Sequence, residues 1–213
     1  MKETKKKKAK NPVAEETKIS PQEKIEASVL SIIQTLGLNA ESEGLRDTPK
    51  RIAKFFTNEL VHGLDPTKVP KITAFKEPNA EFVMLSDIRF YSYCEHHFMP
   101  FFGKVSFGYN PKNGLILGLS KIPRLIQYLA KQPTTQENLT KIIHHVFSKI
   151  LGHGEIAVMV SARHTCMMAR GVEEAESITH TSKFAKVFYT QSELSHQKSI
   201  MVDSHSRAVA KGL

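Results

Sequence analysis

The segment FYSYCEHHFMPFFGKVSFGY, residues 90–109, places one cysteine, one glutamate and two adjacent histidines between two runs of aromatic and β-branched residues. Runs of this composition favour β-strands. Cys94 and His97 are three residues apart, so on one continuous strand their side chains would point to opposite faces. We therefore expect the chain to turn here between two strands, and Pro100 fits such a turn.

The second cysteine, Cys166, lies beside another histidine in the segment RHTCMMARG. Two cysteines are too few for a disulfide scaffold, and thiolate and imidazole together suit Zn²⁺. Cys94, His97 and Cys166 would supply three ligands, which fits a catalytic site whose fourth position is left for water. The alternative is that the cysteines are ordinary core residues.

Composition is that of a globular protein, with 40% hydrophobic and 24% charged residues. No apolar run approaches the ~20 residues of a membrane helix, so we expect a cytoplasmic protein with no membrane partner. Residues 1–10 carry +5 of the net charge of +9, which leaves +4 for the rest. We expect residues 1–18 to be a disordered basic arm, and no nucleic-acid partner for the mildly basic body.

Two helices are expected within residues 20–63. The first begins with Ser20 as N-cap, Pro21 at the first helical position and Glu23 completing a capping box. The second begins near residue 47, and Arg51 and Lys54 on its polar face would ordinarily be solvated.

Strands and helices then alternate in groups. Ser120 can act as the N-cap of a helix that begins at residue 121. Thr134 and Glu137 together offer a capping box for a helix over residues 136–151. Strands are expected near residues 71–75, 81–94, 101–110, 115–119, 155–166 and 178–188, and residues 189–213 are expected to be a polar tail. This order predicts an α+β fold, an antiparallel sheet with helices on one face.

Histidines could move protons at neutral pH in such a site, and His96 and His164 are available if His97 is a ligand. Both could instead be hydrogen-bonded structural histidines. Glu137 could hold a planar N–H edge or could be used by the capping box, and both roles stay open.

Several segments together resemble the GTP cyclohydrolase I family: LRDTPKRIAKFF, CEHHFMPFFGKVSFGYNP, LGLSKIPR, TQENLT and HTCMMARGV, spread over residues 22–188. The resemblance implies a tunnelling fold (T-fold) core over residues 70–188 of a catalytic domain 19–188. It also implies a toroidal homodecamer with active sites at subunit junctions. Departures from the family pattern are IPR after GLSK, THT at residues 179–181, and the sequence from Tyr189 onward.

The reaction implied by the resemblance is hydrolytic opening of the guanine imidazole ring of GTP at C8. Formate is released and 7,8-dihydroneopterin triphosphate forms, a first step toward tetrahydrofolate and other pterins. The residues that the resemblance assigns are Cys94, His97 and Cys166 for Zn²⁺; His96, His164 and Ser120 for catalysis; and Glu137, Lys121, Arg124, Arg170, Lys54 and Arg51 for binding GTP.

Three other interpretations make different predictions. A sister enzyme on the same fold would use a cysteine nucleophile without zinc, or zinc held by histidines alone. A zinc-stabilised module that binds nucleic acid would have a closed four-ligand site and no GTP turnover. A non-catalytic paralogue would lack candidate residues, all of which are present here.

Overall fold

The computed structural model describes residues 19–212, and the predicted basic arm, residues 1–18, lies outside them. The chain divides into two compact units that meet between Lys54 and Phe55. No helix in the described part is long and apolar enough to cross a membrane.

The first unit contains helix α1 (Pro21–Thr35) and most of helix α2 (Thr48–Phe55). The predicted capping box at Ser20 is confirmed: its hydroxyl accepts from the Glu23 N–H at 3.2 Å, and the Glu23 carboxylate accepts from the Ser20 N–H at 2.7 Å. Pro21 follows at the first helical position, where a missing N–H costs nothing. Arg51 and Lys54 lie on α2.

The second unit begins with short helical turns, namely η1 (Phe56–Leu60), η2 (His62–Leu64) and η3 (Pro66–Lys68). A five-stranded sheet follows with the order β5-β2-β3-β6-β7. Strands β2 (Val83–Cys94), β3 (Pro100–Tyr109), β6 (Ile156–His164) and β7 (Thr179–Phe184) are antiparallel, and the short β5 (Pro133–Thr134) runs parallel to the end of β2. A two-stranded sheet pairs β1 (Ala74–Lys76) with β4 (Leu115–Leu117), and η4 (Lys112–Gly114) precedes β4.

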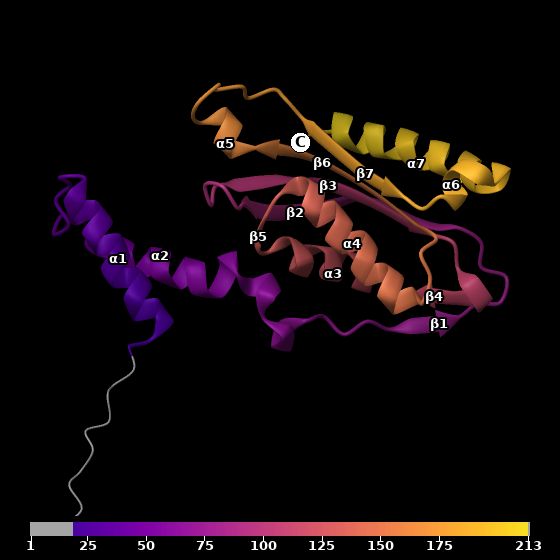
Figure 1. Ribbon diagram of the computed structural model, residues 1–213, viewed down its shortest axis with the longest axis horizontal. Helices are drawn as coiled ribbons and strands as arrows, with labels where there is room; N and C mark the ends of the chain where they lie inside the picture. The colour runs from indigo at the N-terminus through magenta and orange to yellow at the C-terminus, as the bar shows by residue number, and fades with distance from the viewer. Residues whose placement is uncertain (1–18, 213) are drawn as a thin grey trace, which may run out of the picture. The chain divides into compact units, whose positions relative to one another are not determined.

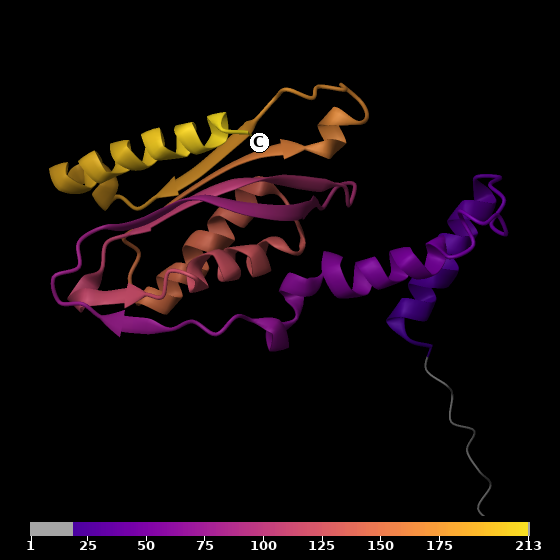
Figure 2. The ribbon, with the colours of Figure 1, turned by 180° about the vertical axis from the view of Figure 1, so that it is seen from behind.

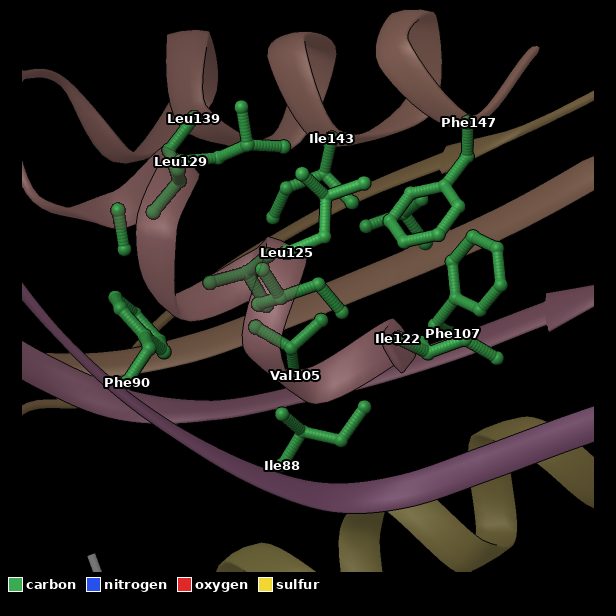
Figure 3. Close-up of a cluster of buried hydrophobic side chains, with 14 of the residues drawn as sticks. Ile88, Phe90, Val105, Phe107, Ile122, Leu125, Leu129, Leu139, Ile143 and Phe147 are labelled. Atoms are coloured by element: carbon green, nitrogen blue, oxygen red, sulfur yellow. The ribbon is translucent and has the colours of Figure 1, made fainter. Parts of the chain in front are cut away.

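The main core lies between this sheet and helices α3 (Lys121–Ala130) and α4 (Gln136–Leu151). Figure 3 shows Phe147 of α4 above Phe107 of β3, and their ring centroids are 4.2 Å apart. Ile143 and Leu125 are also fully buried in this layer. Burial of each such side chain stabilises the fold by roughly 1.5–3 kcal/mol, so this layer fixes α4 firmly on the sheet.

The other face of the sheet is covered by α7 (Ser192–Ala210), which follows the short α6 (Val187–Thr190) (Figures 1 and 2). Leu194, Met201 and Ala208 of α7 are buried. The α+β class is therefore confirmed, but the expectation of helices on one face and of a polar tail over residues 189–213 is wrong. The sequence pattern did not reveal the buried face of α7, because only three apolar residues form it. They are seven residues apart, and histidines and serines lie between them.

The strand register brings distant segments to one end of the sheet. Phe101 of β3 pairs with His164 of β6, and Cys94 of β2 pairs with Thr134 of β5. The end of β2, the end of β6 and the start of α4 therefore meet in space, although they are up to 70 residues apart in the sequence.

Candidate metal centre and active site

The predicted turn after Cys94 is present. The Cys94 N–H donates to the Met99 carbonyl at 2.8 Å, and the Phe98 N–H donates to the Cys94 carbonyl, also at 2.8 Å. Phe98 has a φ of 54°, a left-handed conformation that closes the turn. The reversal lets Cys94 and His97 point to one place, which a continuous strand would forbid.

The third member of the group is Cys166, on the short helix α5 (Thr165–Met168) that follows β6. One ligand atom from each of Cys94, His97 and Cys166 lies within 4.8 Å of the other two. Cys94 is buried and His97 is exposed, so the group sits at the surface of the sheet end. Among the described residues this is the one such group, and its soft donor set fits Zn²⁺.

The electrostatics of the two thiols also favour a bound cation. Burial raises the pKa of Cys166, and the nearby Cys94 raises it further. Two thiolates at this distance repel each other, and a divalent cation between them would remove that repulsion.

Two basic side chains flank the group. Nδ1 of His96 lies 3.5 Å from the Cys94 sulfur. Nη1 of Arg170, just after α5, lies 2.9 Å from Nε2 of His97. The predicted residues His96 and Arg170 are thus brought to the Cys–His–Cys group.

His164 ends strand β6 and stacks on Phe101, with ring centroids 4.7 Å apart and planes 7° apart. Burial lowers the pKa of His164, and the charge of Glu137 opposes that effect. His164 is therefore neutral near pH 7 and can accept a proton there.

Gln136 is a site residue that the sequence reasoning missed. It is 1% exposed, and its amide nitrogen donates to the carbonyls of Val160 (3.1 Å) and Thr179 (2.9 Å). That pattern turns Oε1 toward Nε2 of His164, 2.9 Å away. Oε1 can only accept, so Nε2 carries the hydrogen and Nδ1 of His164 is left available. A glutamine in the first helical turn is ordinarily solvated, so no sequence signal marked it.

Glu137 lies one residue further along α4. The predicted capping box is wrong: the N-cap is Thr135, not Thr134, and its hydroxyl accepts from the Asn138 N–H at 3.1 Å. Glu137 therefore sits at the second helical position, where a capping box does not use it. It lines a cavity of about 230 Å³ together with Cys94, His96, Thr134, Thr135, Gln136, His164, Cys166, Met167 and Thr179.

The remaining predicted residues do not line this cavity. Ser120 precedes α3, and its side chain makes no capping hydrogen bond, contrary to expectation. Lys121 and Arg124 lie in the first turns of α3, whereas its far end leads into β5 beside Cys94. The ten residues of α3 span about 15 Å, which separates the two ends. Arg51 and Lys54 belong to α2.

A Cys–His–Cys group whose two cysteines line a cavity that also holds a carboxylate and a neutral imidazole has the residues of a metal-assisted hydrolase. Comparison with known proteins agrees with that class. The model of the GTP cyclohydrolase I family matches residues 25–202, which includes the first half of α7.

The chain is similar over most of its length to curated proteins named GTP cyclohydrolase 1. It is 42% identical to the protein of Latilactobacillus sakei, in a match that covers 81% of this chain and 92% of the relative. It is also 42% identical to the protein of Enterococcus faecalis, in a match that covers 80% of this chain and 91% of the relative. The relative from Flavobacterium johnsoniae is 39% identical, in a match that covers 84% of this chain and 83% of the relative. The chain belongs to the GTP cyclohydrolase I family, and the prediction that it is an enzyme of this family is confirmed.

Proposed function

We propose that this protein is a zinc-dependent enzyme that opens the imidazole ring of GTP at C8, releases formate and forms 7,8-dihydroneopterin triphosphate. Family membership and the names of the relatives support the reaction. The observation that carries the proposal is the Cys94–His97–Cys166 group beside a cavity that also holds Glu137 and His164.

Two thiolates and one imidazole would hold the metal, namely Cys94, Cys166 and His97. A zinc ion bound there supplies the Lewis acidity needed for hydrolysis at neutral pH. Binding requires both thiols to lose their protons, and the raised pKa of Cys166 makes zinc binding weaker as the pH falls.

Recognition of the base is assigned to Glu137. Its two carboxylate oxygens match the adjacent N1–H and 2-amino donors of guanine, which adenine does not present together. The start of α4 favours a negative charge at this position. Arg170, beside His97, would neutralise part of the triphosphate.

Proton transfer is assigned to His164 and His96. With Nε2 of His164 bonded to Gln136, its Nδ1 would take up and return the proton exchanged with N7 of the guanine ring. His96, beside the Cys94 sulfur, would assist a second proton transfer or contact phosphate.

Assembly into a toroidal decamer of T-fold subunits completes the proposal. Ser120, Lys121 and Arg124 lie at the end of α3 remote from Cys94, so they would act in the site of a neighbouring copy. Strand β7 has one neighbour in the described sheet, and an edge strand of this kind can pair with another subunit. Arg51 and Lys54 are proposed to contact the triphosphate in the same shared site.

The deciding experiment incubates the zinc-replete protein with GTP and measures formate together with the absorbance of dihydroneopterin triphosphate. Equal amounts of both, lost when the zinc is removed with a chelator and regained when it is restored, are the expected result. No turnover by protein with confirmed zinc and an intact oligomer would contradict the proposal. A role in supplying folate or other pterins, and a cytoplasmic location, stay predictions.

A further inference from the structure

A second cluster of polar side chains lies on the face of the sheet opposite α3 and α4, beneath α7. His205 of α7 is 2% exposed, and both of its ring nitrogens contact serines of the sheet. Nδ1 lies 2.8 Å from the Ser106 hydroxyl on β3, and Nε2 lies 2.6 Å from the Ser161 hydroxyl on β6. Both serines are fully buried, so one imidazole links the helix to two strands.

The cluster continues to the edge strand. The Ser161 hydroxyl also lies 2.6 Å from Nδ1 of His180, on β7. At the end of α7, the buried Lys104 donates to the Ala208 carbonyl at 2.6 Å and pairs with Asp87 of β2 at 2.9 Å. The helix is therefore docked by polar contacts to β3 and β6, by a Ser204–Ser86 hydroxyl contact of 3.1 Å to β2, and by the buried Leu194 and Met201; β7 joins the cluster only through Ser161.

The surroundings of His205 oppose a positive charge on it. Two groups on neighbouring strands face His205 and can carry a positive charge, namely Lys104 on β3 and His180 on β7. The nearby carboxylate on β2, that of Asp87, is already paired with Lys104. The contacts from β6 and β3 come from neutral serine hydroxyls. Burial, followed by the charges of His180 and Lys104, lowers the pKa of His205 to about 4.

We propose that α7 is a pH-responsive clamp that stays docked on the sheet while His205 is neutral and loosens when acid protonates that imidazole. The sign follows from linkage. Because the docked state binds the proton less well than a solvated histidine does, docking is at full strength above about pH 6.5 and weakens as the pH falls toward 4.

Strand β7 connects the clamp to the active site. His180 on one face of β7 contacts Ser161 in the cluster, whereas Thr181 and the Thr179 carbonyl accept from Nε2 of Gln136, which holds His164. Loosening of α7 is therefore expected to disturb β7 and lower turnover. This second step rests on the proposed function, whereas the clamp itself does not.

The test measures amide hydrogen exchange of the full-length protein at pH 7.5 and pH 5.0, corrected for intrinsic exchange rates. Protection of α7 should fall roughly thirty-fold at the lower pH, while protection of α3, which contains no histidine, falls by much less. In His205→Gln, α7 should keep its protection at both pH values, because an amide can donate to one serine and accept from the other without titrating. His196→Gln, the same change at an exposed position of α7, should behave like the wild type.

Equal protection of α7 in the wild-type protein at the two pH values would overturn the clamp, as would an unaltered pH response in His205→Gln. If His205→Gln undocks α7 at both pH values, the wild-type comparison of α7 with α3 decides alone. For the link to the site, the ratio of GTP turnover at pH 6.0 to that at pH 7.5 should be higher in His205→Gln than in the wild type. Equal ratios would refute the link, whereas absence of turnover in both would refute the proposed function and leave the exchange result valid.

Discussion

Gln136 shows how one buried amide sets the state of a neighbouring imidazole. Its side-chain nitrogen donates to two backbone carbonyls, so its oxygen faces His164. Because that oxygen can only accept, it fixes which ring nitrogen of His164 carries the hydrogen. The same amide joins α4 to β6 and β7, so a change at Gln136 affects both stability and the site.

We expect Gln136→Leu to destabilise the fold by about 1–3 kcal/mol, because the Val160 and Thr179 carbonyls would be buried without this donor. Denaturant unfolding measures this. The matched control is Gln127→Leu at an exposed position of α3, which should change stability by less than about 0.5 kcal/mol. If the two substitutions lower the free energy of unfolding equally, the hydrogen bonds of Gln136 do not contribute to stability.

Glu137 gives a second prediction at this scale. Because Thr135 and Asn138 form the helix cap, Glu137→Ala should leave α4 intact and weaken GTP binding by more than ten-fold, with unchanged zinc content. Calorimetric titration with GTP, together with a zinc assay, measures both. Asn138→Ala, which keeps the backbone N–H used by the cap, is the control. Unchanged GTP affinity in Glu137→Ala would remove Glu137 from substrate binding.

Among the elements, α7 differs most from what its sequence suggests. It reads as a polar segment, yet it covers the sheet face that contains Ala157 and the partly buried Met84 and Met159. Its docking depends on a few apolar residues and on serine, lysine and histidine contacts that form only when the sheet is assembled. A helix of this kind depends on tertiary contacts rather than on its own propensity.

Removal of α7 tests this dependence. Deletion of residues 192–213 should lower the free energy of unfolding by more than about 3 kcal/mol, because the burial of Leu194 and Met201 is lost and a sheet face is exposed. Thermal unfolding and light scattering measure the stability and the resulting aggregation. Deletion of residues 211–213 alone, beyond the end of α7, should leave both unchanged. A stable, monodisperse protein after the longer deletion would contradict this account.

At the scale of the whole molecule, the positions of the predicted substrate residues matter. One chain gathers Glu137, His164 and the Cys–His–Cys group at one end of its sheet, but it leaves Arg124 near the other end of α3. If all of these act on one GTP molecule, the site must be shared between copies of the chain.

Complementation between two variants tests the shared site. Arg124→Ala and Glu137→Ala should each be nearly inactive alone. Co-expressed in equal amounts, they should regain about a quarter of wild-type activity, because that fraction of randomly assembled sites has both residues intact. Mixing each variant with itself is the control. The composition of the mixed oligomers is verified by mass spectrometry. If these oligomers regain no activity, either Arg124 and Glu137 act in the site of one and the same chain, or they do not belong to the site.

The sequence by itself determined the chemistry of the candidate centre. Each of the two cysteines has a histidine two residues away, and Cys94 lies in a strand–turn–strand pattern. These features predicted a Cys–His–Cys group, because metal preference follows from the ligand atoms themselves. It also determined the α+β class and the capped start of α1, since these depend on local periodicity and on neighbouring residues.

Only the tertiary structure decided which polar residues serve the site and which hold the fold. Thr135 replaced Thr134 as the cap of α4, Gln136 became the partner of His164, and His205 became a buried link between α7 and the sheet. None of these follows from the sequence pattern, because each depends on strand register and helix docking, which bring together groups as many as 99 residues apart. Short polar side chains look alike along the chain, and their burial is set by the partners that the fold supplies.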